Sequence, residues 1–295
     1  PPPKPGTVAA TYRALALGLL RDAVLQDMEP EWLAKVNDKV ITRKYLEDKI
    51  ASAPAEDKAL FEKTRPFLLA QFLQRELLLA EAKKEGLVKD GADDKAENTA
   101  IRDLVKKQVD KVQVTDDELK QAYEKYKSQL GGAKFEDIKD RIREVMLESK
   151  KQEAMAAYML AVSKDAKVTL NRKWAEEQNK LITDNEVDKA RESGKVTMVE
   201  FGAEWCPPCK QMKPVIKQIK DERKDVNIIT IDVDQNRPLS MRYGVQNLPT
   251  QIYFDVKGEE VFRHEGSTPK KMILDKLDEI KKQKADSNPQ PAPAQ

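Results

Sequence analysis

The chain has 295 residues, of which 35% are charged, and its 53 basic residues nearly balance its 51 acidic ones. The net charge of +2 leaves no strongly basic surface of the kind that nucleic-acid binding requires. No run of about 18 apolar residues is present, so we expect no membrane-spanning helix. Two cysteines and one histidine are too few ligands for a structural zinc site, so we expect neither a metal nor a cofactor.

The first 30 residues are predicted to form an N-terminal extension with an amphipathic helix. Pro1–Gly6 is rich in proline and is expected to be disordered. Arg13–Met28 is amphipathic, and its apolar run is too short for the core of a signal sequence. Because the chain starts at Pro1 rather than at methionine, we expect that an export signal has been trimmed.

Residues 31–175 are rich in Lys, Glu, Ala and Leu and almost free of glycine, which predicts successive helices. A short strand and turn at 34–41 is followed by a helix with Thr42 as its N-cap. A long apolar helix is expected at 55–87, kinked or divided by Pro66. Three further helices are expected, at 94–112, after the capping box Thr115-Asp116-Asp117-Glu118, and at 135–163.

This order of elements resembles the N-terminal domain of the SurA/parvulin-type periplasmic chaperones. The resemblance rests on Val36–Thr42, the apolar helix after it, Thr115–Tyr123 and the final long helix. In the prolyl-isomerase members a catalytic domain lies between the positions of Tyr126 and Phe135, whereas only residues 127–134 lie there in this chain. The resemblance therefore implies an all-α, chaperone-like domain without isomerase activity. Its apolar helices form either ordinary core or a groove for unfolded or partner protein, and the sequence leaves both open.

The segments that close this region are expected to lead into a second domain. Residues 167–170 can pair as a strand with the segment 36–41. Asn171–Leu181 is highly charged and is predicted to be a helical connection. Residues 183–283 alternate apolar runs with amphipathic segments, which indicates an α/β domain, and the polar, proline-rich tail 284–295 is expected to be disordered.

The second domain is predicted to contain strands at 195–201, 226–233, 251–256 and 260–264, and helices that begin at Cys206 and Pro269. Both cysteines lie at the first strand–helix junction, in Trp205-Cys206-Pro207-Pro208-Cys209-Lys210. Two thiols separated by two residues can close and reopen a disulfide. A helix N-terminus lowers the pKa of a thiol, so Cys206 is predicted to attack as a thiolate and Cys209, one turn further, to resolve. Half of a zinc knuckle and a coincidental pair are the alternatives.

Residues 183–282 closely resemble the thioredoxin family. The motifs that carry this resemblance are Phe-x-Ala-Glu-Trp-Cys-x-Pro-Cys-Lys from Phe201, Asp-x-Asp-Gln-Asn from Asp232, and Leu248-Pro249-Thr250 before a strand. The resemblance implies a thioredoxin fold with a redox-active Cys206–Cys209 disulfide. It also implies that Pro249 is cis and faces that disulfide. The substrate groove would then include Trp205, Pro207, Pro208 and Leu248.

Glu200 is anomalous because it is a carboxylate inside a strand that is expected to be buried. The resemblance implies a buried acid here that accepts a proton beside the inner cysteine, although Glu replaces the commoner Asp. The alternative is a glutamate that reaches solvent at a strand end. Thr230 stands where classical thioredoxins often carry a buried lysine, and Pro207 replaces the usual glycine, so we expect both to alter redox poise.

These features together predict a thiol–disulfide oxidoreductase that acts on protein cysteines, with a helical domain that holds unfolded or partner protein. We expect it in the periplasm of a Gram-negative bacterium, free or attached to the envelope, with a redox partner that recycles the cysteine pair. One alternative is a non-catalytic holdase or assembly factor that uses the second domain as a scaffold. Another is a dedicated reductase of apocytochrome or of a single partner. The sequence does not decide between reduction, oxidation and isomerisation.

Overall fold

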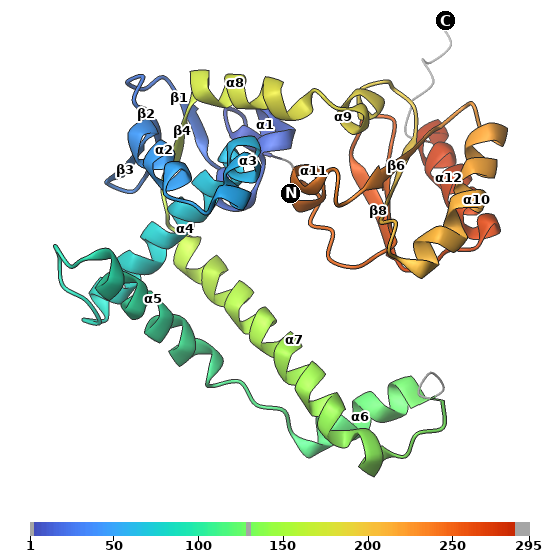
Figure 1. The fold of residues 1–295 in the computed structure, drawn as a ribbon, viewed down its shortest axis with the longest axis horizontal. Coiled ribbons are helices and arrows are strands. Elements are labelled where there is room, and N and C mark those ends of the chain that lie inside the picture. Colours follow the sequence, from blue (N-terminus) through green and yellow to red (C-terminus); the bar gives the residue numbers. More distant parts are fainter. Residues whose placement is uncertain (1–2, 128–130, 287–295) are drawn as a thin grey trace, which may run out of the picture.

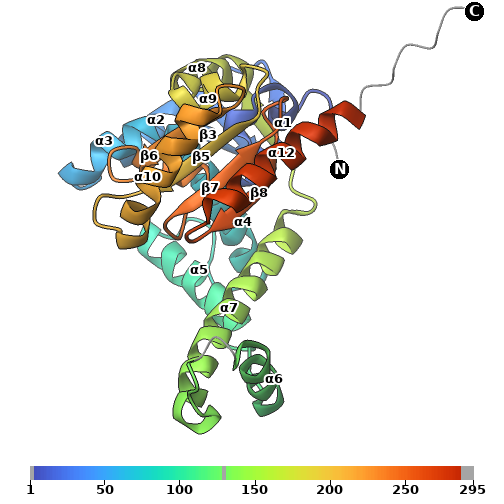
Figure 2. The same cartoon turned by 90° about the vertical axis from the view of Figure 1, so that its right-hand side faces the viewer.

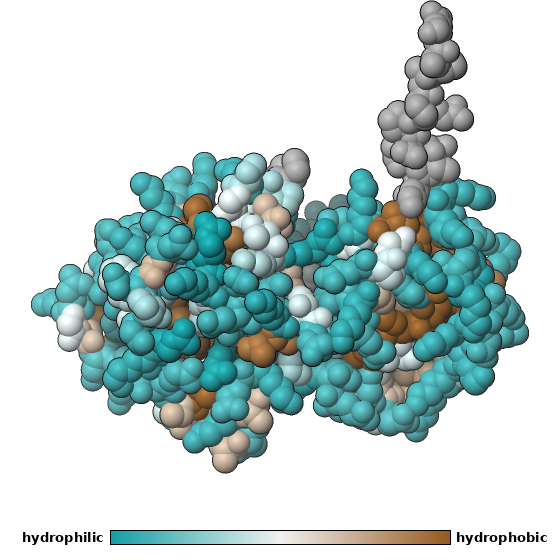
Figure 3. Space-filling model, turned by 90° about the horizontal axis from the view of Figure 1, so that it is seen from above, coloured by the Kyte–Doolittle hydropathy of each residue, from teal (hydrophilic) through white to brown (hydrophobic). Residues whose placement is uncertain are grey.

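Two four-stranded sheets divide the chain into two domains in the computed structural model, which describes residues 3–127 and 131–286 (Figure 1). The N-terminal domain carries a long helical arm, and the C-terminal domain lies beside its compact part. The face seen from above in Figure 3 is mainly hydrophilic, with separate apolar patches. Within the described residues, no helix combines the length and apolarity that crossing a bilayer would need.

The N-terminal sheet has the strand order β1-β4-β2-β3. Its strands are β1 (Val24–Gln26), β2 (Trp32–Val36), β3 (Lys39–Thr42) and β4 (Val168–Asn171). β2 and β3 form a hairpin whose turn contains Asn37 at φ 52°, a left-handed conformation that asparagine tolerates. β4 was expected to pair with 36–41, and it pairs with β2, antiparallel, and with β1, parallel. The expectation of an all-α domain is therefore wrong, although the region is rich in helices.

The predicted helix at Arg13–Met28 is absent. The chain there makes two 3-10 turns, Arg13–Leu15 and Gly18–Leu20, and then enters β1. Gly18 has φ 47°, outside helical geometry, and the long-range pairing of β1 with β4 overrides the local amphipathic pattern. Part of the predicted N-terminal disorder is also wrong, because Gly6 accepts a hydrogen bond from the Leu25 amide. Residues 1–2 lie outside the described residues.

The helices of the N-terminal domain follow the sequence pattern closely from residue 43 onwards, and the short first helix was not predicted. They are α1 (Val8–Thr11), α2 (Arg43–Ala51), α3 (Ala55–Lys63), α4 (Arg65–Lys84), α5 (Asp94–Val109), α6 (Asp116–Tyr126) and α7 (Phe135–Ser163). The long apolar segment is divided at Thr64, and Pro66 lies in the first turn of α4. The Thr115 side chain and Glu118 form the predicted capping box of α6. α5, α6 and α7 extend away from the sheet as an arm (Figure 2).

The segment predicted as a connection is a helix, α8 (Arg172–Thr183), that belongs to the N-terminal core. Trp174 is only 2% exposed there and packs among residues from β1, β2 and α4. Leu15 and Leu20, from the predicted extension, are fully buried in the same core. The N-terminal core therefore begins before residue 31 and continues past residue 175.

The C-terminal sheet has the strand order β6-β5-β7-β8, with β6 parallel to β5 and the other pairs antiparallel. Its strands are β5 (Thr197–Gly202), β6 (Asn227–Asp232), β7 (Thr250–Phe254) and β8 (Glu260–Glu265). α10 (Pro207–Glu222) and α12 (Lys270–Asp286) cover one face, and α9 (Glu186–Arg191) and α11 (Arg237–Arg242) cover the other. Every residue of β5 is buried, because neighbours lie on both edges and helices on both faces.

The tail predicted to be disordered, 284–295, begins inside α12, so its first three residues are helical rather than disordered. Residues 287–295 lie outside the described part of the chain.

Arg13 joins the two domains at the turn between β7 and β8. Its guanidinium donates to the carbonyls of Lys257 and Gly258 and forms an ion pair with Glu259. Arg191 of α9 also donates to the Gly258 carbonyl. A Cβ at Gly258 would lie 2.7 Å from the Arg191 carbonyl oxygen, and φ is 72°, so this close contact requires glycine.

We predict that Trp174→Ala destabilises the N-terminal domain by about 3–5 kcal/mol, because it leaves a large cavity in a packed core. Urea unfolding followed by far-UV circular dichroism measures this loss. Trp32→Ala is the matched control, since Trp32 is 41% exposed. Equal losses from the two substitutions would contradict the placement of α8 in the core.

Candidate active site

Cys206 and Cys209 form a disulfide just beyond the C-terminal end of β5, with their Cα atoms 5.3 Å apart. Cys206 is the N-cap of α10, and its sulfur accepts a hydrogen bond of 3.3 Å from the Cys209 amide. Pro207 and Pro208 occupy the first turn, where the helix has no use for their missing N–H groups. The same amide and the helix dipole would stabilise a thiolate on Cys206 once the disulfide opens.

Both cysteines are nearly covered, Cys206 at 3% and Cys209 at 1% exposure. They pack with Ala203, and Val233 and Leu248 lie against them. The expected difference in reactivity between the two sulfurs therefore comes more from backbone position than from exposure. Cys206 is the N-cap of α10, whereas Cys209 lies inside its first turn. Trp205, in contrast, is 65% exposed beside them.

The Trp205 indole is held by a residue that the sequence analysis did not single out. Its Nε1 donates a hydrogen bond of 2.8 Å to Asp234, in the loop after β6. Asp234 belongs to the Asp-x-Asp-Gln-Asn motif, so the motif carried a signal for it. The pairing fixes an exposed aromatic ring next to the disulfide.

The Leu248–Pro249 peptide bond is cis, and Pro249 is buried directly before β7. The Pro249 carbonyl accepts a hydrogen bond of 2.7 Å from Gly266 after β8. Leu248 packs on the cysteine cluster. The loop before β7 thus contributes one wall next to the disulfide.

Glu200 lies in the middle of β5 and is only 3% exposed, which excludes the alternative of a glutamate in solvent at a strand end. A Cβ built on Gly202 would lie 3.1 Å from Glu200 Oε1 and 3.5 Å from Cys209 Sγ. The carboxyl group and the inner sulfur therefore lie around the same empty side-chain position. Glycine at 202 lets them approach.

Burial raises the pKa of Glu200 from 4.5 to about 7, and the charge of Lys213 opposes part of this shift. Lys213 also forms an ion pair with Glu204 and is half exposed, so it compensates only weakly. A carboxyl group that titrates near neutral pH can take up and release a proton at the operating pH.

Gln251 lies opposite Glu200 on β7 and is fully buried, and its polarity in an apolar strand was a signal that the sequence analysis passed over. Its amide donates to the Gly266 carbonyl at 3.2 Å and accepts from Thr268 at 2.7 Å. Both polar groups of the Gln251 side chain therefore bond to the loop after β8, which lies beside the site. Thr230 of β6 pairs with Glu200 across the other edge of β5, and it is exposed. The position at which classical thioredoxins often carry a buried lysine therefore lies at the surface of the sheet in this chain.

The described residues contain no group of three or more His, Cys, Asp or Glu side chains placed to hold a metal ion. The Cys206–Cys209 pair brings its own chemistry to this site. A thiolate at a helix N-terminus, a covered second sulfur and an adjacent buried acid can together carry out disulfide exchange.

Comparison with known proteins gives a family match that begins in α8. The Thioredoxin family model matches residues 178–279. The chain is 38% identical over 98 residues to thioredoxin from Staphylococcus epidermidis, covering 33% of this chain and 92% of that protein. It is 38% identical over 90 residues to thioredoxin from Chlorobaculum thiosulfatiphilum, covering 30% and 82%. Protein disulfide-isomerase erp38 from Neurospora crassa is 41% identical over 90 residues, which cover 29% of this chain and 24% of that protein.

Among solved structures, thioredoxin NaTrxh from Nicotiana alata is 33% identical and covers 32% of this chain and 80% of its own, with a TM-score of 0.30.

We predict that Glu200→Gln stabilises the oxidised protein at high pH and not at low pH. Because the pKa of Glu200 is raised in the folded state, the folded protein keeps this proton at a pH where the unfolded chain has lost it. Glu200 therefore lowers the free energy of unfolding as pH rises above 4.5, and the full loss is present above about 7. The free energy of unfolding should rise by about 3 kcal/mol at pH 8 and change little at pH 4. Urea unfolding at the two pH values measures it, with the exposed Glu204→Gln as control. The same gain at both pH values would mean that Glu200 is not buried as an ionisable group.

Proposed function

The chain belongs to the thioredoxin family through its C-terminal domain, and we propose that it exchanges disulfides with the cysteines of protein substrates. The observation that carries the proposal is the disulfide between Cys206 at the N-cap of α10 and Cys209, with Glu200 beside the inner sulfur. Using the domain purely as a scaffold would require neither thiol. The proposal therefore favours an enzyme over a non-catalytic assembly factor.

In the reducing direction, the Cys206 thiolate attacks one sulfur of a substrate disulfide, and the other substrate sulfur leaves as a thiolate. Cys209 then loses its proton to Glu200 and attacks Cys206 in the mixed disulfide, which releases the substrate sulfur. Two electrons pass to the substrate, and the pair ends as the Cys206–Cys209 disulfide. A second thiol–disulfide protein would restore the dithiol. Oxidation of a substrate dithiol is the same sequence in reverse.

Trp205, Pro207, Pro208, Leu248 and Pro249 would form the surface on which the substrate sulfur approaches Cys206. Support comes from the exposed Trp205 ring and from the packing of Leu248 on the cysteine cluster. Pro249 has no N–H and contributes its rigid cis geometry to this wall.

The N-terminal domain is proposed to hold unfolded or partner protein for this exchange, in the periplasm of a Gram-negative bacterium. Support comes from the resemblance of residues 31–170 to the SurA/parvulin-type chaperones. The arm also extends on the side of the molecule where α10 begins (Figures 1 and 2), and Val145 and Leu160 of α7 are 64% and 73% exposed. A polypeptide held on this domain would have a raised local concentration at Cys206.

Cys209→Ser is expected to accumulate mixed disulfides with protein substrates, because Cys206 still attacks and no thiol resolves the product. Cys206→Ser is expected to accumulate almost none, since Cys209 lies inside the first turn of α10 and lacks the N-cap position of Cys206. Each reduced variant is mixed with a disulfide-containing unfolded protein, blocked with an alkylating agent and separated on a non-reducing gel. The double substitution is the control. Equal trapping by both single variants would reverse or remove the assigned roles.

Removing residues 1–183 should leave the rate on a small aromatic disulfide unchanged and slow the reduction of an unfolded, disulfide-containing protein by at least about tenfold. The break after Thr183 keeps α8 with its own core, whereas a break near Trp174 would divide that core. Stopped-flow rates with both substrates give the comparison. Equal rates on the unfolded protein would leave the N-terminal domain as a docking or oligomerisation module.

A further inference from the structure

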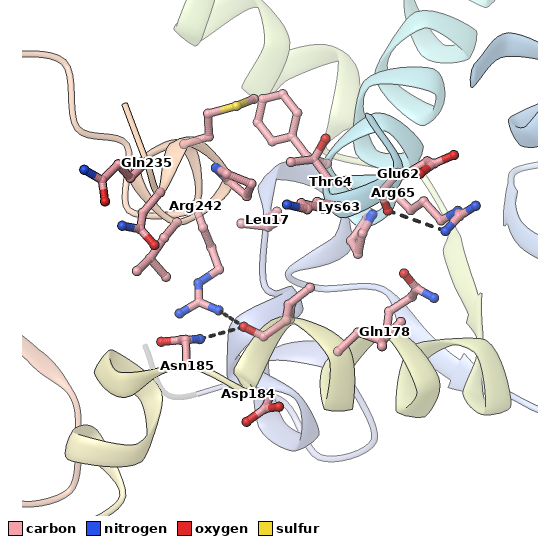
Figure 4. Close-up of a pocket in the computed structure, with 18 residues that line it drawn as sticks. Leu17, Glu62, Lys63, Thr64, Arg65, Gln178, Asp184, Asn185, Gln235 and Arg242 are labelled. Carbon is pink, nitrogen blue, oxygen red and sulfur yellow. Dashed lines mark hydrogen bonds between the residues drawn. The ribbon is translucent and has the colours of Figure 1, made fainter. Parts of the chain in front are cut away.

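A groove of about 520 Å³ lies between the two domains (Figure 4). One side is formed by the corner between α3 and α4 and by the end of α8, and the other by α11 and the loop before it. The groove depends on both domains, so neither domain alone would contain it.

The groove is preformed, because a buried arginine ties its two sides together. Arg242 of α11 donates to the Ile182 carbonyl of α8 at 2.9 Å, and its side chain is only 9% exposed. Asn185 donates to the same carbonyl at 2.8 Å, as the dashed lines in Figure 4 show. Asp188 neutralises Arg242. These contacts hold α8 and α11 at a fixed separation.

The lining favours an uncharged, apolar occupant. Leu181 is 69% exposed, and Leu17, Phe67, Leu239 and Met241 contribute half-buried apolar surface to the same groove. The remaining charged residues of the lining balance, with Lys63 and Arg65 against Glu62 and Asp184. A groove of this kind has no net charge with which to select an ionic ligand.

The groove lies near the candidate active site. Gln235 and Asn236, which line it, follow Asp234, and Asp234 holds Trp205 next to Cys206. The path from Cys206 through this hydrogen bond to Gln235 is at most about 20 Å, which about six residues of extended chain can span. A polypeptide whose cysteine reacts at Cys206 can therefore reach the groove.

We propose that this groove binds an apolar segment of the polypeptide substrate, within about six residues of its reacting cysteine. This inference rests on the proposed function, and it adds which polypeptide substrates the protein would prefer. Folded proteins bury such segments, whereas unfolded chains expose them. The groove would thus select unfolded polypeptides with leucine or phenylalanine near the cysteine.

The test is single-turnover reduction by the full-length reduced protein of two synthetic peptides, each carrying one cysteine as a mixed disulfide with glutathione. One peptide has leucine and phenylalanine four to six residues from the cysteine on both sides, and the other has serine at those positions. We expect the second-order rate constant of reduction to be about tenfold higher for the apolar peptide, because one or two apolar side chains are buried in the groove.

Leu181→Glu should reduce this ratio to near one, and Leu181→Met should keep it. Met272→Glu is the matched control, because Met272 is an exposed apolar residue of helix α12 outside the groove, and it should also keep the ratio. No turnover of either peptide would refute the proposed function itself. Turnover with a ratio of one in the unmodified protein, or a ratio unaffected by Leu181→Glu, would refute the groove alone.

Analytical ultracentrifugation of the same variants tests whether a second copy of the chain, rather than a substrate segment, occupies the groove. A dimer of the unmodified protein that Leu181→Glu converts to a monomer would assign the groove to a second copy of the chain and overturn the proposal. A monomer in both cases, together with the change in ratio, would support it.

Discussion

The absence of a side chain at Gly202 is the constraint on which the candidate site depends. Glu200 and Cys209 both approach the position that a Cβ would take there, at 3.1 Å and 3.5 Å. A Cβ there would require the carboxyl group and Cys209 to shift by a few tenths of an ångström, and a longer side chain would have to separate them further. The inner sulfur and the acid could then no longer be neighbours. The strand β5, which carries Glu200, is also central in its sheet, and this position removes water from the carboxyl group.

That removal of water has opposite consequences for stability and for chemistry. A buried carboxylate disfavours the folded state at neutral pH, because the charged form loses its hydration. The same effect raises the pKa of Glu200 to about 7, where the group can exchange a proton with a thiol. Thr230 does not supply a buried positive charge to cancel the effect, and Lys213 is half exposed. Proteins keep such unfavourable groups mainly at functional sites.

Local features could be predicted from the sequence, and long-range pairing could not. The strand–helix junction at Cys206, the division of the apolar helix before Pro66 and the capping box at Thr115 depend on residues close in sequence. β1 and the burial of Trp174 depend instead on contacts more than a hundred residues apart along the chain, which no local pattern encodes. The amphipathic pattern of 13–28 was real, but Leu15 and Leu20 are buried through non-helical turns. In the site, motif matching reached Glu200 but passed over Gln251, whose role comes from a loop that folds back after β8.

The contacts between the domains are of a kind that does not change with the redox state of the cysteines. Arg13 donates to backbone carbonyls of the β7–β8 turn, and Arg242 donates to the Ile182 carbonyl. Arginine remains charged in proteins, and backbone carbonyls do not titrate, so these bonds persist as protons move at the active site. The groove between the domains therefore keeps its shape while Cys206 cycles between thiolate, mixed disulfide and disulfide. A substrate segment bound there would stay in place through both exchange steps, which a surface formed by the reacting residues alone could not ensure.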